Sequence, residues 1–363
     1  MADDLHDDRE EAAGSGAMKI LVRATNWIGD AVMSIPALWA IRRRWPEAEI
    51  TILARPAVAE LYEGQDFANR VMSLSGNLKN PVIAERESRK LRSERFDCAV
   101  LLQNAFSAAW LMWRAKVPER IGYARDARGL LLTRAVAVPE AGEIPAHESY
   151  YYLELLRRAG WLDEIPKVEQ ISLKLDPEMV ARAEVRIREA GARSKTRIAL
   201  APGASYGSAK CWLPERFAAV ADALVDDFQA DVILFGTSSE IEICRKIAER
   251  MRHRPVSLAG QTSMNELPAL FSRCSLFLGN DSGAMHVAAA VGLPVVAVFG
   301  STDPEGTAPI ATQKILVRHA VACSPCFLRE CPIDHRCMTR VPAEDVRRAA
   351  ARMLEEKRIA QSV

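Results

Sequence analysis

The sequence lacks long apolar runs and the fingerprints of several common ligand sites. No hydrophobic stretch in its 363 residues approaches the ~20 residues that cross a bilayer, and no apolar signal segment opens the chain. No GxGxxG or P-loop pattern follows a predicted strand, and no nucleic-acid module pattern is present. These absences predict a soluble, cytoplasmic protein. They disfavour a classical dinucleotide enzyme and a nucleic-acid partner.

The first 17 residues have the composition of a disordered tail. They contain six acidic residues, one Arg, no aromatic residue and a Gly-Ser-Gly. Such a segment has too little apolar surface to offset the entropy that folding removes. We therefore expect the folded chain to begin at Met18.

Positive charge is concentrated in the first half of the folded chain. Residues 18–135 contain 19 Lys and Arg against 12 Asp and Glu, a net charge of 19 − 12 = +7, whereas residues 136–363 contain 28 against 29. A basic half beside a neutral half suggests an anionic surface or ligand for the first half alone. Solvated helix faces are an equally good explanation at this stage.

Strand and helix patterns alternate along the chain and predict an α/β protein. Its length suits two α/β domains followed by a terminal helix, with boundaries that give residues 18–175, 176–345 and 346–363. Predicted strands occupy residues 19–24, 50–54, 71–74, 98–102, 121–123, 135–138, 197–201, 231–235, 256–258, 276–279 and 295–299.

Residues 279–300, GNDSGAMHVAAAVGLPVVAVFG, form the clearest structural unit. The pattern predicts a strand end, a tight turn, a close-packed helix and a second strand that is buried on both faces. Asp281, Ser282 and Gly283 stand at the helix N-terminus, where a diphosphate could bind free N–H groups. An ordinary helix cap is the alternative.

Two more loops at predicted strand ends carry polar side chains. The segment 202–212, PGASYGSAKCW, is rich in Gly and Ser and contains Ser205 and Lys210, which suit a pyrophosphate. Glu240 follows the strand 231–235, where an acid would meet ribose hydroxyls, although a helix-capping role is the simpler explanation.

The first predicted strand leads into TNWIGD, which places Asp30 in the first turn of a helix. An acid there is stabilised by the helix dipole, and this alone would account for it. The strand 98–102 leads likewise into QNAFS, which contains Asn104 and Ser107.

Five segments together resemble the bacterial lipopolysaccharide heptosyltransferases, glycosyltransferase family 9. They are NWIGDAVMSIPA, QNAFSAA, APGASYGSAKCWLPERFA, LFGTSSE and GNDSGAMHVAAA, in that order, and the resemblance covers nearly all of residues 18–360. NWIGDAVMS is more similar to the type II than to the type I enzymes. The resemblance implies the GT-B fold, with two Rossmann-like domains that face a central cleft.

The resemblance also implies an inverting transfer of heptose from ADP-L-glycero-β-D-manno-heptose, with no cofactor. Asp30 would be the catalytic base. The donor site would consist of Ser205, Lys210, Glu240, Asp281, Ser282, Gly283 and His286. Lys210 would also be catalytic, because it opposes the charge on the departing ADP.

For the acceptor, the resemblance implies heptosyl-Kdo-lipid A, with Asn104 and Ser107 as contacts. It makes residues 18–175 the acceptor domain and 176–345 the ADP-heptose domain, on the cytoplasmic face of the inner membrane. The alternatives are heptosyltransferase I, a transferase for another nucleotide sugar, and a non-catalytic glycolipid-binding protein.

Four of the eight cysteines lie within fifteen residues, at Cys323, Cys326, Cys331 and Cys337, with His335 between the last two. In a cytoplasmic protein such clustering suggests a soft metal more than disulfides. The spacing does not match a standard zinc finger. Metal binding, pairing and free thiols therefore all stay open.

Overall fold

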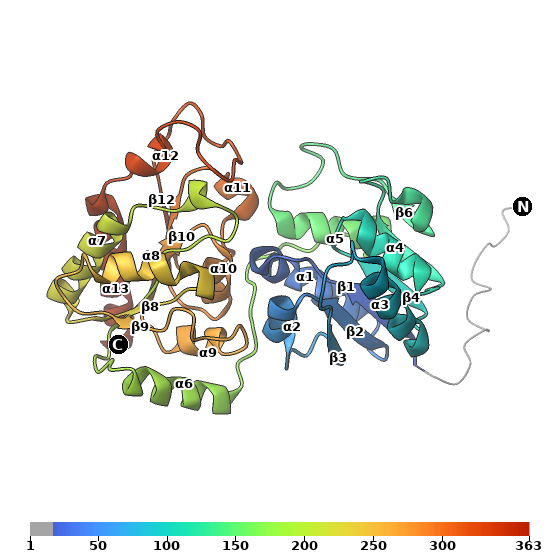
Figure 1. Cartoon of the computed structure of the whole chain (residues 1–363), viewed down its shortest axis with the longest axis horizontal. Coiled ribbons are helices and arrows are strands. Elements are labelled where there is room, and N and C mark those ends of the chain that lie inside the picture. The colour runs from blue at the N-terminus through green and yellow to red at the C-terminus, as the bar shows by residue number, and fades with distance from the viewer. Residues whose placement is uncertain (1–16, 363) are drawn as a thin grey trace, which may run out of the picture.

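The computed structural model describes residues 17–362, and the predicted tail lies outside these apart from Ala17. Two six-stranded parallel sheets organise the chain (Figure 1). The first sheet contains β1 (Lys19–Arg23), β2 (Glu49–Ala54), β3 (Arg70–Ser73), β4 (Cys98–Leu101), β5 (Glu119–Tyr123) and β6 (Arg134–Val136). The second contains β7 (Arg197–Ala201), β8 (Asp231–Leu234), β9 (Val256–Ser257), β10 (Leu276–Asn280), β11 (Val295–Phe299) and β12 (Lys314–Arg318).

Both sheets have the same strand order. The first runs β3-β2-β1-β4-β5-β6, and the second runs β12-β11-β10-β7-β8-β9, which is the same order read from the other edge. This is the doubly wound order in which the chain reverses direction between the first and fourth strands, and ligands bind at that reversal. The switch points lie between β1 and β4 and between β7 and β10.

Helices cover both faces of each sheet. The first half contains α1 (Ile28–Arg44), α2 (Pro56–Tyr62), α3 (Pro81–Glu94), α4 (Phe106–Arg114) and α5 (Glu148–Arg158). The second half contains α6 (Pro177–Glu189), α7 (Pro214–Phe228), α8 (Ile241–Ala248), α9 (Leu267–Ser272), α10 (Gly283–Ala290), α11 (Pro304–Thr307), α12 (Arg336–Thr339) and α13 (Ala343–Ser362). Short 3-10 turns lie at Gly129–Leu131, Ser208–Lys210 and Ser238–Glu240.

One hydrophobic core is shared by the two halves. Side chains of α1, α2 and α5 belong to the same buried cluster as side chains of α9 and α10, so the facing helices of the two sheets pack together. Separate clusters lie under α3 and α4 on the far side of the first sheet, and under α7, α8 and α13 on the far side of the second. The two halves therefore meet through a core.

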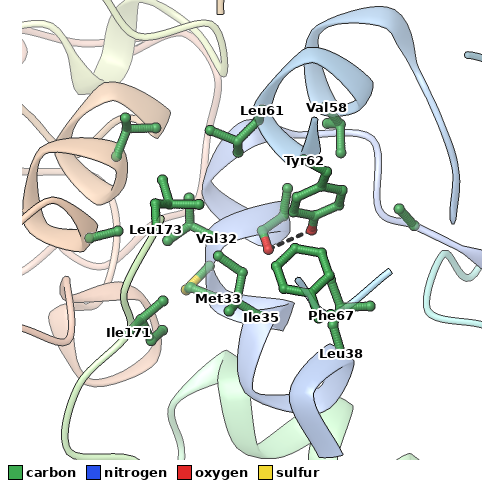
Figure 2. Packing of buried hydrophobic residues seen from close by; sticks show 14 of the residues in the cluster. Val32, Met33, Ile35, Leu38, Val58, Leu61, Tyr62, Phe67, Ile171 and Leu173 are labelled. Carbon is green, nitrogen blue, oxygen red and sulfur yellow. Dashed lines mark hydrogen bonds between the residues drawn. The ribbon is translucent and has the colours of Figure 1, made fainter. Parts of the chain in front are cut away.

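The centre of this packing is shown in Figure 2. Tyr62 and Phe67 stack edge to face with ring centroids 5.3 Å apart, beside the α1 side chains. The Tyr62 hydroxyl donates to the carbonyl of Ala31 at 2.7 Å, which satisfies its polar group inside the core. Leu173, in the segment between α5 and α6, is buried in the same cluster, and its N–H donates to the Ala290 carbonyl at 2.9 Å. The segment between α5 and α6 therefore packs against both halves of the protein.

Strand β12 is not among the eleven strands that the sequence predicts, although its residues KILVR are identical to those of β1. β1 is central and buried along four of its five residues, whereas β12 is an edge strand of which no residue is fully buried. The eleven predicted strands are confirmed within one or two residues at each end. Among residues 17–362 no helix is long and apolar enough to span a bilayer.

We expect Phe67→Ala to lower the free energy of unfolding by about 3–5 kcal/mol, because it removes a fully buried ring and leaves a cavity. Urea unfolding followed by circular dichroism measures this. Val82→Ala is the control, since Val82 is 75% exposed and should change stability by less than about 0.5 kcal/mol. Equal effects of the two variants would contradict the description of this core.

Candidate active site

Most of the candidate residues from the sequence lie at the two switch points, whereas Glu240 follows β8. Asp30 lies in the first turn of α1, directly after β1, while Asn104 and Ser107 follow β4. In the second half Lys210 follows β7, and Asp281 follows β10. These are the positions at which parallel α/β sheets bind ligands.

The N-terminal turns of α1 and α10 touch each other. A Cβ atom on Gly283 would lie 2.8 Å from Ile28 Cβ and 3.3 Å from the Gly29 nitrogen. A Cβ atom on Gly29 would lie 3.2 Å from His286 Cδ2. Only glycine fits at the first of these contacts, so Gly283 serves the contact between the halves in this structure. Two positive helix ends therefore converge beside Asp30.

Ser282 is the N-cap of α10, and its hydroxyl accepts from the Met285 N–H at 3.4 Å. The helix-cap alternative is thus observed for this residue. Ser205 lies exposed on the loop after β7.

A buried ion pair joins the two loops of the second switch point. Lys210 Nζ lies 2.6 Å from Asp281 Oδ2, with side chains only 12% and 3% exposed. The Thr302 hydroxyl donates to the same carboxylate oxygen at 2.5 Å. An ammonium has three donors, so the contact to Asp281 leaves donors available for a ligand.

Asp30 faces this ion pair across the contact between the halves. Burial raises the pKa of Asp30 to about 6, the positive charge of Lys210 opposes the rise, and the negative charge of Asp281 adds to it. The carboxylate is therefore a stronger base than an exposed Asp. It also lies within electrostatic reach of both members of the pair.

His286 lies one helical turn into α10 and is 4% exposed. Burial lowers the pKa of His286 to about 4, and the Asp281 carboxylate only partly opposes that effect. The imidazole is thus neutral at neutral pH, and it can accept or donate a hydrogen bond without adding charge to the site.

Glu240 makes a capping box at the turn after β8. Its Oε2 accepts from the Thr237 N–H at 2.8 Å and from the Thr237 hydroxyl at 3.0 Å. A Cβ atom on Gly203 would lie 1.9 Å from the other oxygen, Oε1, so the carboxylate lies directly against the β7 loop. The capping alternative is observed, and it holds Oε1 over that loop.

Asn104 is held from both ends of its amide. Its Oδ1 accepts from Arg128 Nη2 at 2.8 Å, and its Nδ2 donates to the Tyr151 hydroxyl at 3.1 Å. Arg128 is one of the 19 basic residues in residues 18–135, a segment whose charge suggests an anionic surface or ligand. It is instead completely buried and donates to the carbonyls of Tyr123 and Gln103. Ser107 is partly buried in the first turn of α4.

Sequence reasoning missed two residues of this site. Thr302 follows β11 at the same sheet edge as Asp281, and its position after a predicted strand was the available signal. Glu148 begins α5, and burial raises its pKa to about 6, with the negative charge of Asp30 adding to the effect. No motif marked Glu148, because helix packing brings it there.

The clustered cysteines lie in and just after the loop that follows β12. All four are free thiols, with Cys323 and Cys326 exposed and Cys337 buried. Across residues 17–362 no three His, Cys, Asp or Glu side chains are placed to hold a metal ion.

Comparisons with known proteins show the family of the chain. The profile of glycosyltransferase family 9 (heptosyltransferase) matches residues 85–336. The chain belongs to this family. The lipooligosaccharide heptosyltransferase 2 of Haemophilus influenzae is 29% identical over 319 residues, which are 83% of this chain and 88% of that protein.

Solved members of the family share the fold. The ADP-heptose LPS heptosyltransferase II of E. coli superposes with a TM-score of 0.80 at 25% identity, over 94% of this chain and 100% of that one. An E. coli heptosyltransferase solved with ADP gives a TM-score of 0.67 at 17% identity. The superposition covers 93% of this chain and 100% of that one. The predicted GT-B fold is confirmed.

Asp30→Asn should stabilise the ligand-free protein at pH 8 by up to about 3 kcal/mol. The pKa of Asp30 is raised from 3.8 to about 6 on folding, and each unit corresponds to about 1.4 kcal/mol. The stability that the protonated carboxyl contributes is fully present below the pKa of 3.8 in the unfolded chain. It is lost as the pH rises through the pKa of about 6 in the folded chain. The gain in the variant should therefore shrink steadily between pH 7 and pH 4.

Urea unfolding at pH 8 and pH 5 measures this difference. Exposed Asp163→Asn is the control and should change stability by less than about 0.5 kcal/mol at either pH. A gain for Asp30→Asn that is the same at both pH values would contradict the burial of an ionisable carboxyl.

Lys210→Ala should destabilise the protein by about 3–5 kcal/mol, because it leaves the Asp281 carboxylate buried without its cation. The double variant Lys210→Ala/Asp281→Ala should cost about 1–3 kcal/mol less than the sum of the two single changes. A double-mutant cycle in urea measures the coupling, and additive losses would show that the pair is not coupled.

Proposed function

We propose that the protein is an inverting heptosyltransferase of type II. It transfers L-glycero-D-manno-heptose from ADP-L-glycero-β-D-manno-heptose to heptosyl-Kdo-lipid A, the inner core of lipopolysaccharide. The observation that carries this proposal is the meeting of Asp30 from one switch point with the Lys210–Asp281 pair from the other. The names of the family and of its relatives support the donor and the acceptor.

In this proposal Asp30 is the general base. It takes the proton of the acceptor hydroxyl as the oxygen attacks the anomeric carbon from the face opposite ADP, so the configuration inverts without a covalent intermediate. A base with a pKa of about 6 is well suited to operation near neutral pH, where it is mostly ionised yet still has proton affinity.

Lys210 stabilises the departing ADP. Negative charge grows on the diphosphate as the glycosidic bond breaks, because the leaving oxygen keeps the bonding electron pair. The remaining donors of the ammonium and the N-terminus of α10 oppose that charge, and such preorganised groups contribute several kcal/mol. The reaction as proposed requires no metal or other cofactor.

The remaining contacts divide between the two halves. In residues 176–345 Glu240 would bind the ribose through Oε1, His286 and Asp281 the donor sugar, and Ser205, Ser282 and Gly283 the phosphates. In residues 18–175 Asn104 and Ser107 would contact the acceptor. The firm hold of Arg128 and Tyr151 on Asn104 supports a fixed acceptor site.

We infer that the first half works at the cytoplasmic face of the inner membrane. The acceptor is a phosphorylated glycolipid with carboxylates, and residues 18–135 have a net charge of +7 that suits such a partner. This contact is peripheral.

The decisive experiment measures ADP release from ADP-heptose with purified heptosyl-Kdo-lipid A. Wild type should turn over, and Asp30→Ala should lose at least ~100-fold in kcat. Turnover only with Kdo-lipid A that lacks heptose would make the protein a type I enzyme. Binding of the glycolipid without release of ADP from ADP-heptose in the presence of either acceptor would overturn the transferase proposal with this donor.

The rate should also depend on pH. We expect kcat/KM to fall about tenfold per pH unit below an apparent pKa near 6, because protonated Asp30 cannot act as the base. Glu148 also titrates near 6, so Glu148→Gln is the matched variant and should retain the acid limb. Two results would exclude Asp30 as the titrating base. One is loss of the acid-side fall in kcat/KM in Glu148→Gln, and the other is a wild-type fall that sets in only near pH 4.

A further inference from the structure

The ion pair at the proposed donor site leaves little net positive charge for a diphosphate. Lys210 is neutralised by Asp281 at 2.6 Å, and Asp30 adds a second carboxylate nearby. A diphosphate that gains charge during the reaction needs a further cation, because desolvated anions are stable only beside opposite charge.

An arginine without a carboxylate partner lies at this place. Arg329 Cζ is 5.3 Å from the ring centroid of Tyr206, and Lys210 Nζ is 5.0 Å from the same centroid. Within residues 17–362, no ion pair joins the Arg329 guanidinium to a carboxylate. The two cations thus contact one aromatic ring, and only one of them is neutralised.

The backbone of Arg329 is fixed to the loop that carries Lys210. Its carbonyl accepts from the Ala209 N–H at 2.9 Å, and a Cβ atom on Gly207 would lie 2.2 Å from that carbonyl oxygen. Two residues earlier, the Phe327 carbonyl accepts from the Tyr206 hydroxyl at 2.6 Å. The arginine is therefore placed relative to Lys210 by main-chain contacts, before any ligand binds.

Arg329 also reaches the other half of the protein. Its Cζ lies 6.0 Å from the ring centroid of Trp27, the N-cap residue of α1, three positions before Asp30. Aromatic faces attract a guanidinium but leave its N–H donors free for a bidentate contact with phosphate oxygens.

We propose that Arg329 is the second cation that binds the diphosphate of the sugar-nucleotide donor, with Tyr206 and Trp27 as its aromatic supports. This inference rests on the proposed function and adds a residue to the donor site that no motif indicated. Arg329 acts through binding and charge stabilisation, whereas the proton transfer belongs to Asp30.

Calorimetric titration with ADP and with AMP tests the inference. Arg329→Gln should weaken ADP binding by about 10- to 100-fold, the usual effect of losing a charged hydrogen bond to an anion. AMP lacks the second phosphate, so its affinity should fall by less than about threefold. Arg329→Lys should restore part of the ADP affinity, because it keeps the charge but loses the planar fork.

Exposed Arg340→Gln is the matched control, since it removes one positive charge from the same region and should leave ADP affinity unchanged. Unchanged ADP binding in Arg329→Gln would overturn the inference, and so would equal losses for ADP and AMP. An increased KM for the acceptor with normal ADP affinity would show that the anion belongs to the acceptor, which also overturns it. Wild type that binds no ADP would overturn the proposed function as well.

Discussion

The site depends on the contact between the N-terminal turns of α1 and α10. Gly283 allows Ile28 and Gly29 to approach within van der Waals distance, and the shared core behind them keeps the two halves in register. Without this contact Asp30 would sit at the end of a solvated helix, with the ordinary pKa of an aspartate. Packing between two helices thus determines the chemistry of a carboxylate.

The same packing makes the site costly for stability. An aspartate with a raised pKa is partly buried, a lysine and an aspartate are buried as a pair, and a histidine is kept neutral. Each of these states disfavours the folded chain relative to a simpler core, and the hydrophobic cluster formed by α1, α2, α5, α9 and α10 offsets the cost. Buried ionisable groups that lower stability are common at active sites, where the pKa of a catalytic group must suit the proton transfer that it carries out.

Repetition of one strand order explains why so much of the site could be predicted. In each doubly wound sheet, the loops after the first and fourth strands meet at the switch point. Polar residues in those four loops, including Asp30 and Asp281, could be recognised from strand-then-loop patterns. Thr302 follows the predicted strand β11 and carried the same signal, although it was not recognised. Glu148 and Arg329 could not be recognised in this way, because Glu148 is brought in by helix packing and Arg329 lies in a loop without regular structure.

Local periodicity and turn chemistry are enough to predict the α/β class and eleven of the strands, while five motifs indicate the family and the polar residues that follow five of those strands. The edge strand β12, the burial of Arg128 and the pairing of Lys210 with Asp281 become visible in the tertiary structure alone. The rise in the pKa of Asp30 depends on it as well. Those features depend on desolvation and on partners distant in the chain, and a local pattern contains neither.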